Sequence, residues 1–319
     1  MSNTKRPLLV VCVLSLMLVT MFTARTSNSD TFKIFREGIV RDLKGIAEKQ
    51  ASVIREYVEN EKRNIKVASY DLHNYYAKSD YSKALEYLIS VQDIYHYKEI
   101  FVANTAGNVV LSTEVDHIGT DMFSSEAGTT IFSRQYFKKA RSGETFVSDV
   151  IGSVIPIKNE EGQLELGMPT MFISTPILSA DAQVLGILVF RIDIKQINSL
   201  MFHMNATKSG DVYLINRDGY MLTESRFTDA LELVGHIEKR TSLELRVVSP
   251  DTNNLTLSAK KCITGDEAKH SGYGYADYRN RRVLGYWVWM EEYQWGVIVE
   301  IDLAEACQDI REYEFPQFF

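Results

Sequence analysis

The hydrophobic pattern between residues 31 and 70 predicts one long helix around which the chain is organised. Apolar residues recur three or four positions apart, charged residues fill the positions between them, and no proline interrupts the stretch. Such a helix exceeds the diameter of one small domain, so we expect it to back two stacked modules or to pair with a copy of itself. A break near Gly45 into two shorter helices is the alternative. The apolar stripe comprises Phe32, Phe35, Ile39, Leu43, Ile46, Ile54, Val58 and Ile65.

A second apolar run precedes this helix and has no polar face. Residues 7–22 carry no charge and follow Lys5 and Arg6. The run is long for the core of a signal peptide and slightly short of the roughly 20 residues of a full membrane span. We expect an uncleaved anchor with its positive end inside the cell and the rest of the chain outside. A signal peptide that is removed is the alternative.

Beyond residue 70 the pattern alternates between short helices and strands, which predicts the α+β class. Apolar residues follow one another or recur every second position in the strands, and Asn, Gly and Asp mark the turns. Helices are expected at 80–92, 134–140 and 193–204, with a last helix capped by Asp302. Strands are expected at 99–104, 109–113, 145–150, 171–177, 184–192, 210–216, 220–223, 273–278, 282–290 and 295–301.

The two sets of strands resemble each other, which suggests a duplicated module. Asn104 and Asn216 each end an apolar strand, three residues before Gly107 and Gly219 respectively. Later, each set closes with a Gly-containing apolar strand, an Ile-Asp pair and a predicted helix. We therefore expect two tandem modules, each with an antiparallel sheet. The predicted domains are an anchor at 1–30, a stalk and dimerisation helix at 31–70, modules at 71–200 and 201–305, and a truncated lead-in to a second membrane span at 306–319.

Composition and motifs exclude several function classes. The net charge is −7 and the basic residues form no strip, which argues against nucleic acid as a partner. The sequence contains no HExxH, GxSxG or P-loop motif, and the six histidines are scattered, so we expect no catalysis and interpret these histidines as surface or structural residues. No spacing of cysteine and histidine suits zinc, and no cofactor motif is present. Whether Cys262 pairs with Cys307 depends on the fold.

The best candidate for chemistry is the short predicted helix that begins at Arg134. Two aromatic residues, Tyr136 and Phe137, follow this arginine closely. A guanidinium group beside aromatic side chains can bind a small carboxylate in a bidentate manner. The alternative is an arginine that only bridges the helix to a carbonyl or an acidic residue.

Residues 31–305 as a whole resemble the double Cache domain, the extracytoplasmic sensor of bacterial chemoreceptors, sensor histidine kinases and diguanylate cyclases. The resemblance rests on the order of several pieces: the long helix after an anchor, Arg-x-Tyr-Phe-x-x-Ala at 134–140, Ser148-Asp149, Leu-Gly-Ile-Leu at 185–188 and the closing Trp-Gly-Val-Ile-Val at 295–299. It implies two PAS-like modules behind one helix, of which the membrane-distal module usually holds the ligand. The resemblance places these residues around the distal pocket: Arg134, Tyr136, Phe137, Ser148, Asp149, Ser174 and Arg191.

The chain departs from the amino-acid-binding pattern of that family. The family has an aspartate that pairs with the ammonium group of the ligand, and this chain has Arg191 at that position. A cation there repels an ammonium group by about 1 kcal/mol or more at 4 Å even in a water-like dielectric. We therefore expect a small carboxylate rather than a free amino acid, provided that the strand register turns Arg191 toward the pocket.

The resemblance implies a ligand-binding input domain of a receptor in the inner membrane of a bacterium, with the sensor portion in the periplasm. Such a receptor is expected to form a homodimer through its long helix. The alternative is a membrane-anchored binding protein that acts without an output domain of its own. An exported hydrolase is a third possibility, and no catalytic constellation supports it.

Overall fold

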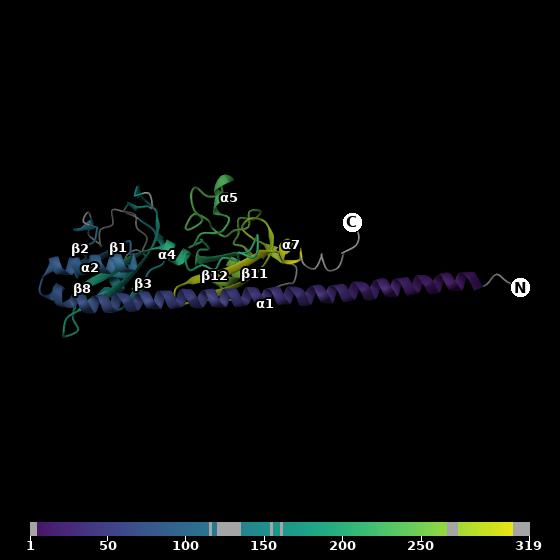
Figure 1. The fold of residues 1–319 in the computed structure, drawn as a ribbon, viewed down its shortest axis with the longest axis horizontal. Helices are drawn as coiled ribbons and strands as arrows, with labels where there is room; N and C mark the ends of the chain where they lie inside the picture. The colour runs from purple at the N-terminus through teal and green to yellow at the C-terminus, as the bar shows by residue number, and fades with distance from the viewer. Residues whose placement is uncertain are drawn as a thin grey trace.

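The computed structural model describes residues 5–114, 117–119, 135–153, 156–159, 162–266 and 274–308, with side chains from residue 34 onward. One helix, α1 (Lys5–Ala77), runs along the length of the molecule, and two α+β modules lie one after the other on the same side of it (Figure 1). The first module, residues 81–198, lies at the end of α1 farthest from the N-terminus. The second module, residues 211–306, lies against the middle of the helix. The predicted α+β architecture is confirmed.

Helix α1 is unbroken over 73 residues, which corresponds to about 110 Å at 1.5 Å per residue. The alternative of two shorter helices is wrong, because the helix passes through Gly45. A glycine inside a helix costs about 1 kcal/mol relative to alanine. The buried stripe on either side of Gly45 offsets that cost. This stripe comprises Leu43, Ala47, Ala51, Ile54, Val58, Ile65, Ala68 and Leu72.

The first module contains an antiparallel sheet in the order β2-β1-β8-β7-β3, with β4 paired to β7 outside this path. Its long central strands β7 and β8 are buried on both faces, which explains their continuous apolar runs. The strands are β1 (Glu99–Asn104), β2 (Val109–Ser112), β3 (Phe146–Val147), β4 (Ile151–Gly152), β7 (Pro169–Leu178) and β8 (Val184–Asp193), with a separate hairpin of β5 (Ile157–Lys158) and β6 (Leu164–Glu165). The helices are α2 (Tyr81–Tyr95), α3 (Gln135–Arg141) and α4 (Ile194–Asn198).

The second module repeats this arrangement with an antiparallel sheet in the order β10-β11-β12-β9. Its strands are β9 (Asp211–Asn216), β10 (Tyr275–Ala276), β11 (Arg282–Met290) and β12 (Trp295–Asp302). Its helices are α5 (Thr228–Leu233), α6 (Leu257–Ile263) and α7 (Leu303–Ala306).

Two predicted strands are shorter in the structure, since 145–150 contains only the two-residue β3, and the described part of 273–278 contains only the two-residue β10. Three further predictions differ from the structure. The strand expected at 220–223 is replaced by isolated bridges, because Tyr220 pairs with Arg246 and only Met221 pairs back to β9. The helix expected at 193–204 is the five-residue α4. Asp302 makes no side-chain cap on α7, since its carboxylate instead accepts from Arg279 at 2.6 Å.

The two modules share the same turn after their first strand, which supports duplication. In the first module the side-chain oxygen of Asn104 accepts from the backbone N–H groups of residues 106 and 108, both at 3.0 Å. In the second, Asn216 accepts from residues 218 and 220 at 3.0 and 2.9 Å. Gly107 and Gly219 follow with φ of 96° and 82°, a conformation that favours glycine.

Each sheet has one face toward α1 and one face under a short helix. In the first module, alternation along β7 turns Met171 and Ile173 toward the α1 core and Phe172 toward α3. In the second module α6 packs on the face opposite α1, where Ala259 and Cys262 are buried. Cys262 is a free thiol, so it does not pair with Cys307.

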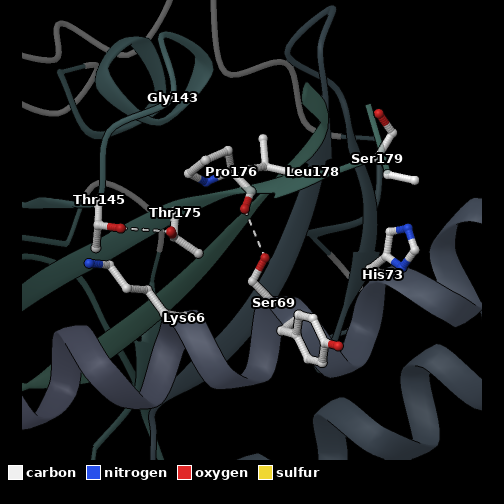
Figure 2. Close-up of a pocket in the computed structure, with 11 residues that line it drawn as sticks. Lys66, Ser69, His73, Gly143, Thr145, Thr175, Pro176, Leu178 and Ser179 are labelled. Atoms are coloured by element: carbon white, nitrogen blue, oxygen red, sulfur yellow. Dashed lines mark hydrogen bonds between the residues drawn. The ribbon is translucent and has the colours of Figure 1, made fainter. Parts of the chain in front are cut away.

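Polar side chains of α1 fix both modules to the helix. In the first module, Ser69 donates to the backbone carbonyl of Pro176 in β7 at 2.8 Å (Figure 2). In the second module, the hydroxyl of Tyr293 donates to Glu59 of α1 at 3.1 Å. Between the modules, Gln50 accepts from the backbone N–H of Phe202 at 2.8 Å. Hydrogen bonds to α1 therefore hold the chain against this helix at several positions along its length.

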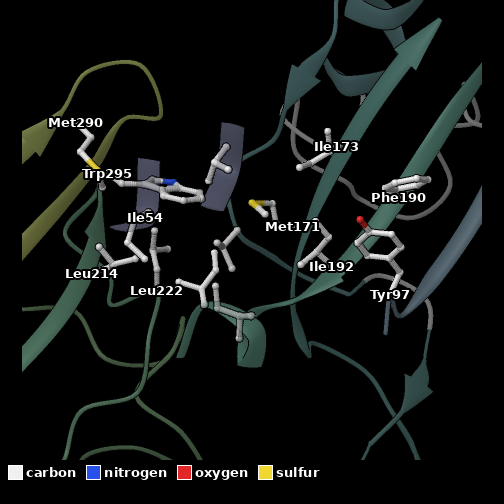
Figure 3. Close-up of a cluster of buried hydrophobic side chains, with 14 of the residues drawn as sticks. Ile54, Tyr97, Met171, Ile173, Phe190, Ile192, Leu214, Leu222, Met290 and Trp295 are labelled. Atoms are coloured by element: carbon white, nitrogen blue, oxygen red, sulfur yellow. The ribbon is translucent and has the colours of Figure 1, made fainter. Parts of the chain in front are cut away.

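Figure 3 shows that the core is continuous from one module to the other. Trp295 and Leu214 of the second sheet lie on one side of Ile54 in α1, and Met171 and Phe190 of the first sheet lie on the other. Trp295 is fully buried and its ring nitrogen donates to Asp149 of the first module at 2.9 Å. A second direct link joins Glu165 of the β5–β6 hairpin to Arg240 at 2.6 Å.

The predicted anchor at 7–22 falls inside α1, in a stretch whose side chains are not described. Within the described part of the chain, no helix combines the length and apolar character needed to cross a membrane. The segment 306–319 lies almost entirely outside the described residues.

Candidate functional site

Polar and aromatic side chains gather on the α3 face of the first sheet. Strand alternation puts the odd residues of β1 and β8, and the even residues of β7, on this face. Glu99 of β1 lies opposite Arg191 of β8, and Arg191 lies opposite Phe172 of β7. Arg191 therefore points toward α3, which is the register that the ligand hypothesis required.

A buried ion pair forms the centre of this face. The Arg191 guanidinium donates to Oε2 of Glu99 at 3.3 Å, and both side chains are 4% exposed. The other oxygen of Glu99 accepts from Ser112 at 2.9 Å and contacts Nδ1 of His117 at 2.6 Å. The side chains of Arg191 and His117 thus converge on one carboxylate.

The pKa values in this cluster follow from these contacts. Burial alone would raise the pKa of Glu99, but His117 and Arg191 together lower it. The hydrogen bond to Glu99 raises the pKa of His117 above its usual value. Burial lowers the pKa of Arg191, and Glu99 opposes that effect. When His117 is protonated, the three side chains carry one net positive charge.

An aromatic pair lies beside the charges. The rings of Tyr136 in α3 and Phe172 in β7 stack with their centroids 4.9 Å apart. The Arg191 guanidinium carbon lies 5.4 Å from the centroid of Phe172, within range of a cation–π interaction. Burial raises the pKa of Tyr136, so its hydroxyl keeps its proton at neutral pH.

Two buried polar atoms of this face have no hydrogen-bond partner among the described residues. They are Nε of Arg191 and the hydroxyl oxygen of Thr170. Thr170 is fully buried and, by alternation along β7, lies on the same face as Phe172. An unsatisfied buried polar group costs about 1–3 kcal/mol, so two of them on one face need a physical reason.

The structure brings together some of the predicted site residues. Tyr136, Phe137 and Arg191 lie on or against the α3 face, and Ser174 donates to the backbone carbonyl of Tyr136 at 2.7 Å, which fixes α3 to β7. Arg134, the first residue of the hypothesis, lies outside the described residues.

Ser148 and Asp149 do not join this cluster. The Ser148 hydroxyl donates to the backbone carbonyl of Asp149 and accepts from the N–H of Phe172 at 2.9 Å, so it fixes the chain after β3. The Asp149 carboxylate accepts from Trp295 of the second module. Its partner lies 146 residues away in the sequence, which no local pattern could indicate.

Sequence reasoning missed Glu99, His117 and Thr170. Glu99 had a usable signal, because it is an acidic residue that opens a fully buried strand. His117 was interpreted as a surface or structural residue, and the structure places it against a buried carboxylate. Nothing in the sequence distinguishes Thr170 from a threonine that suits any strand.

The second module buries its acids in a different way. Glu300 accepts from Ser258 at 2.7 Å and from Tyr213 and Tyr275 at 2.9 Å each. Burial, followed by the charge of Asp277, raises the pKa of Glu300 to about 7. Every carboxylate oxygen of Glu300 has a hydroxyl donor, so this network is satisfied by the protein itself.

Metal binding finds no support in the part of the chain that is described. No three His, Cys, Asp or Glu side chains of those residues lie close enough to hold an ion.

Comparison with known proteins agrees with this architecture. The sequence model of the Cache domain family matches residues 32–310. No curated protein sequence matches the chain.

Three solved structures share the fold at low sequence identity. The ligand-binding domain of the Campylobacter jejuni chemoreceptor Tlp3, crystallised with L-norvaline, is 11% identical with a TM-score of 0.56, and the match covers 86% of this chain and 94% of that one. The periplasmic sensory domain of the C. jejuni chemoreceptor Tlp1 is 14% identical with a TM-score of 0.55, over 86% and 98%. The sensor domain of the V. cholerae histidine kinase DctB is 13% identical with a TM-score of 0.50, over 83% and 98%.

Proposed function

Because the chain belongs to the Cache domain family, we propose that it is the extracytoplasmic small-molecule sensor of a bacterial membrane receptor. Structural neighbours that are sensor domains of chemoreceptors and of a histidine kinase support this assignment. The first module, at the far end of α1, is the membrane-distal one and holds the ligand on its α3 face.

The ligand is a small molecule that carries a carboxylate. One observation carries this proposal: Nε of Arg191 and the hydroxyl of Thr170 are buried on the same face without a partner among the described residues. Both are N–H or O–H donors, and a carboxylate oxygen is the acceptor that a guanidinium binds best. Binding would then recover the free energy that the unsatisfied donors cost in the empty protein.

The net charge of Glu99, Arg191 and His117 together, rather than the charge of Arg191 alone, favours an anionic ligand. Arg191 is not an uncompensated cation, because Glu99 is its ion-pair partner. The Arg191 charge alone therefore gives no basis for excluding an ammonium group. Protonated His117 restores one net positive charge to the cluster, and a ligand carboxylate would balance it.

Arg134 remains a predicted second ligand-binding residue beside Arg191. It directly precedes α3 in the sequence, and α3 carries Tyr136, whose ring stacks on Phe172. A diacid held by two arginines is the ligand that this arrangement would bind most strongly.

The rest of the receptor is part of the same proposal. An N-terminal anchor at 7–22 would place the modules in the periplasm, with 306–319 leading to a second span. Two copies would associate through α1, which extends beyond the second module and presents Ile34, 69% exposed (Figure 1). A helix without tertiary packing is marginal in water, so this stretch needs a partner.

A membrane-anchored binding protein without its own output is the alternative. Both proposals expect binding without catalysis, and they differ in whether ligand changes the activity of an attached signalling domain. Reading the gene beyond codon 319 separates them.

Thermal unfolding of the full chain tests the binding proposal. We expect organic acids to raise the melting temperature more than amino acids, amines or purines do. The variant Thr170→Val keeps the shape of the side chain and removes one donor to the ligand, so we expect about tenfold weaker binding of the acid. Its own stability should not fall, since the hydroxyl has no partner to lose.

The matched control is Thr223→Val. Thr223 is also fully buried, but its hydroxyl accepts from the N–H of Leu214 at 2.9 Å in the second module. This variant should lose about 1 kcal/mol of stability and keep the affinity of the wild type. A panel in which only amino acids raise the melting temperature would contradict the carboxylate proposal.

A further inference from the structure

A groove on the opposite face of the first sheet has the features of a second ligand site. We propose that it binds a small organic anion with a flat apolar body. The groove encloses about 420 Å³ between α1, the chain that leads into β3, and the end of β7 (Figure 2). It goes beyond the sensor function proposed above, because the sheet separates it from Arg191.

Strand alternation places the two sites on different faces. Thr175 of β7 lines the groove and shares the α1 face with Ile173 and Ile177. Phe172 lies on the other face, where it stacks with Tyr136. Glu99, His117 and Arg191 of the charge cluster are not among the residues that line the groove.

The wall of the groove contains a hydroxyl group that can donate a hydrogen bond to a ligand. The oxygens of Thr145 and Thr175 lie 2.8 Å apart, so one hydroxyl donates to the other. The second hydroxyl has no acceptor among the described residues, and Thr175 is only 3% exposed. Nearby, Ser69 uses its proton on the carbonyl of Pro176, which leaves its oxygen to accept.

The charge of the lining points to an anion. Lys66 and His73 line the groove from α1, and none of the described residues in its lining is acidic. Lys66 forms no ion pair with any described residue, although the chain as a whole carries a net charge of −7. Figure 2 shows its side chain extended toward Thr145, so that its ammonium group and a hydroxyl group lie at the same end of the groove.

The remainder of the lining is apolar and suits a flat body. Tyr70 on α1 is 79% exposed and lines the groove. Pro176 and Leu178 of β7 line the groove with it. An aromatic carboxylate can place its ring against these side chains and its charge at Lys66 and Thr145.

The full chain can be titrated with 4-fluorobenzoate and observed by ¹⁹F NMR, with 4-fluorobenzamide as the neutral analogue of the same shape. The proposal predicts saturable binding of the benzoate that is at least tenfold tighter than that of the amide. Equal binding of the two compounds, or no saturable binding of the benzoate, would overturn it.

Two pairs of variants locate the binding. Lys66→Met should weaken 4-fluorobenzoate at least tenfold, whereas Lys62→Met should not, because Lys62 is one turn away and pairs with Glu59 at 2.7 Å. Thr175→Val should weaken binding as well, and Thr170→Val should leave it unchanged. A loss in Thr170→Val without a loss in Lys66→Met would mean that the probe binds the α3 face, which would refute the second site and leave the first intact.

Discussion

The ring nitrogen of Trp295 donates a hydrogen bond of 2.9 Å to the carboxylate of Asp149. Trp295 opens the central strand of the second sheet, and Asp149 follows β3 of the first. Burial raises the pKa of Asp149, and the bond from Trp295 opposes that effect. The two modules therefore share a part-buried polar contact as well as an apolar core, and a movement of β3 and β7 on ligand binding has a direct route to the second sheet.

Removing this contact should cost stability. Trp295→Phe keeps most of the ring and deletes the donor, which leaves the partly buried carboxylate of Asp149 with one partner fewer. We expect a loss of about 2 kcal/mol in the free energy of unfolding, measured with urea at pH 7. Trp289→Phe is the control, because its ring nitrogen donates to the exposed Glu291. A Trp295 variant no less stable than the Trp289 variant would show that the contact does not join the modules.

Removing one partner of the buried Arg191–Glu99 ion pair should lower the stability of the protein more than replacing both partners does. Arg191→Met removes one of the partners of the buried Glu99 and leaves its contact with His117, so we expect it to lose about 1.5–3 kcal/mol of stability. Adding Glu99→Gln to the same chain removes the carboxylate charge and should restore part of the loss. The comparison requires urea unfolding of the two single variants and the double variant without ligand, and additive losses would contradict the pairing.

Glu300 should make the second module less stable as the pH rises. Its pKa is raised to about 7 in the folded chain and is near 4.5 in the unfolded chain, so the folded state binds more protons between these values. Stability from this group is therefore greatest below pH 4.5 and falls as the pH rises through 7, by about 3 kcal/mol in total.

The variant Glu300→Gln resembles the protonated carboxyl and should remove that dependence. Compared with the wild type, it should be more stable at pH 8 and nearly equal at pH 5 in urea unfolding. The same difference at both pH values would show that Glu300 does not titrate in this range.

The elements that could be predicted from the sequence are those that local patterns determine. The buried stripe of α1, the apolar runs of β7 and β8, and the matched turns at Asn104 and Asn216 all follow from periodicity or turn chemistry within a few residues. The predicted strand at 220–223 was wrong because an isolated bridge can have the same alternation of apolar and polar residues as a strand. Only the pairing of Tyr220 with the distant Arg246 distinguishes the two.

The site was harder to predict because its contacts join distant residues. The direction of Arg191 depended on one residue of register, and its partner Glu99 lies 92 positions earlier. Asp149 belonged to the expected site by sequence, yet its partner is in the other module. Thr170 differs from other strand threonines because its buried hydroxyl has no hydrogen-bond partner among the described residues. This feature can be recognised only when the positions of the neighbouring strands are known.

The measurement that tests the account most directly is hydrogen exchange of the full chain with and without an organic acid that raises its melting temperature. Ligand on the α3 face predicts slower exchange in residues 135–141 and 170–174, and less of this slowing in Thr170→Val at the same concentration of acid. Slower exchange confined to the second module, or no organic acid that stabilises the chain at all, would contradict the proposal that the first module holds a carboxylate beside Arg191.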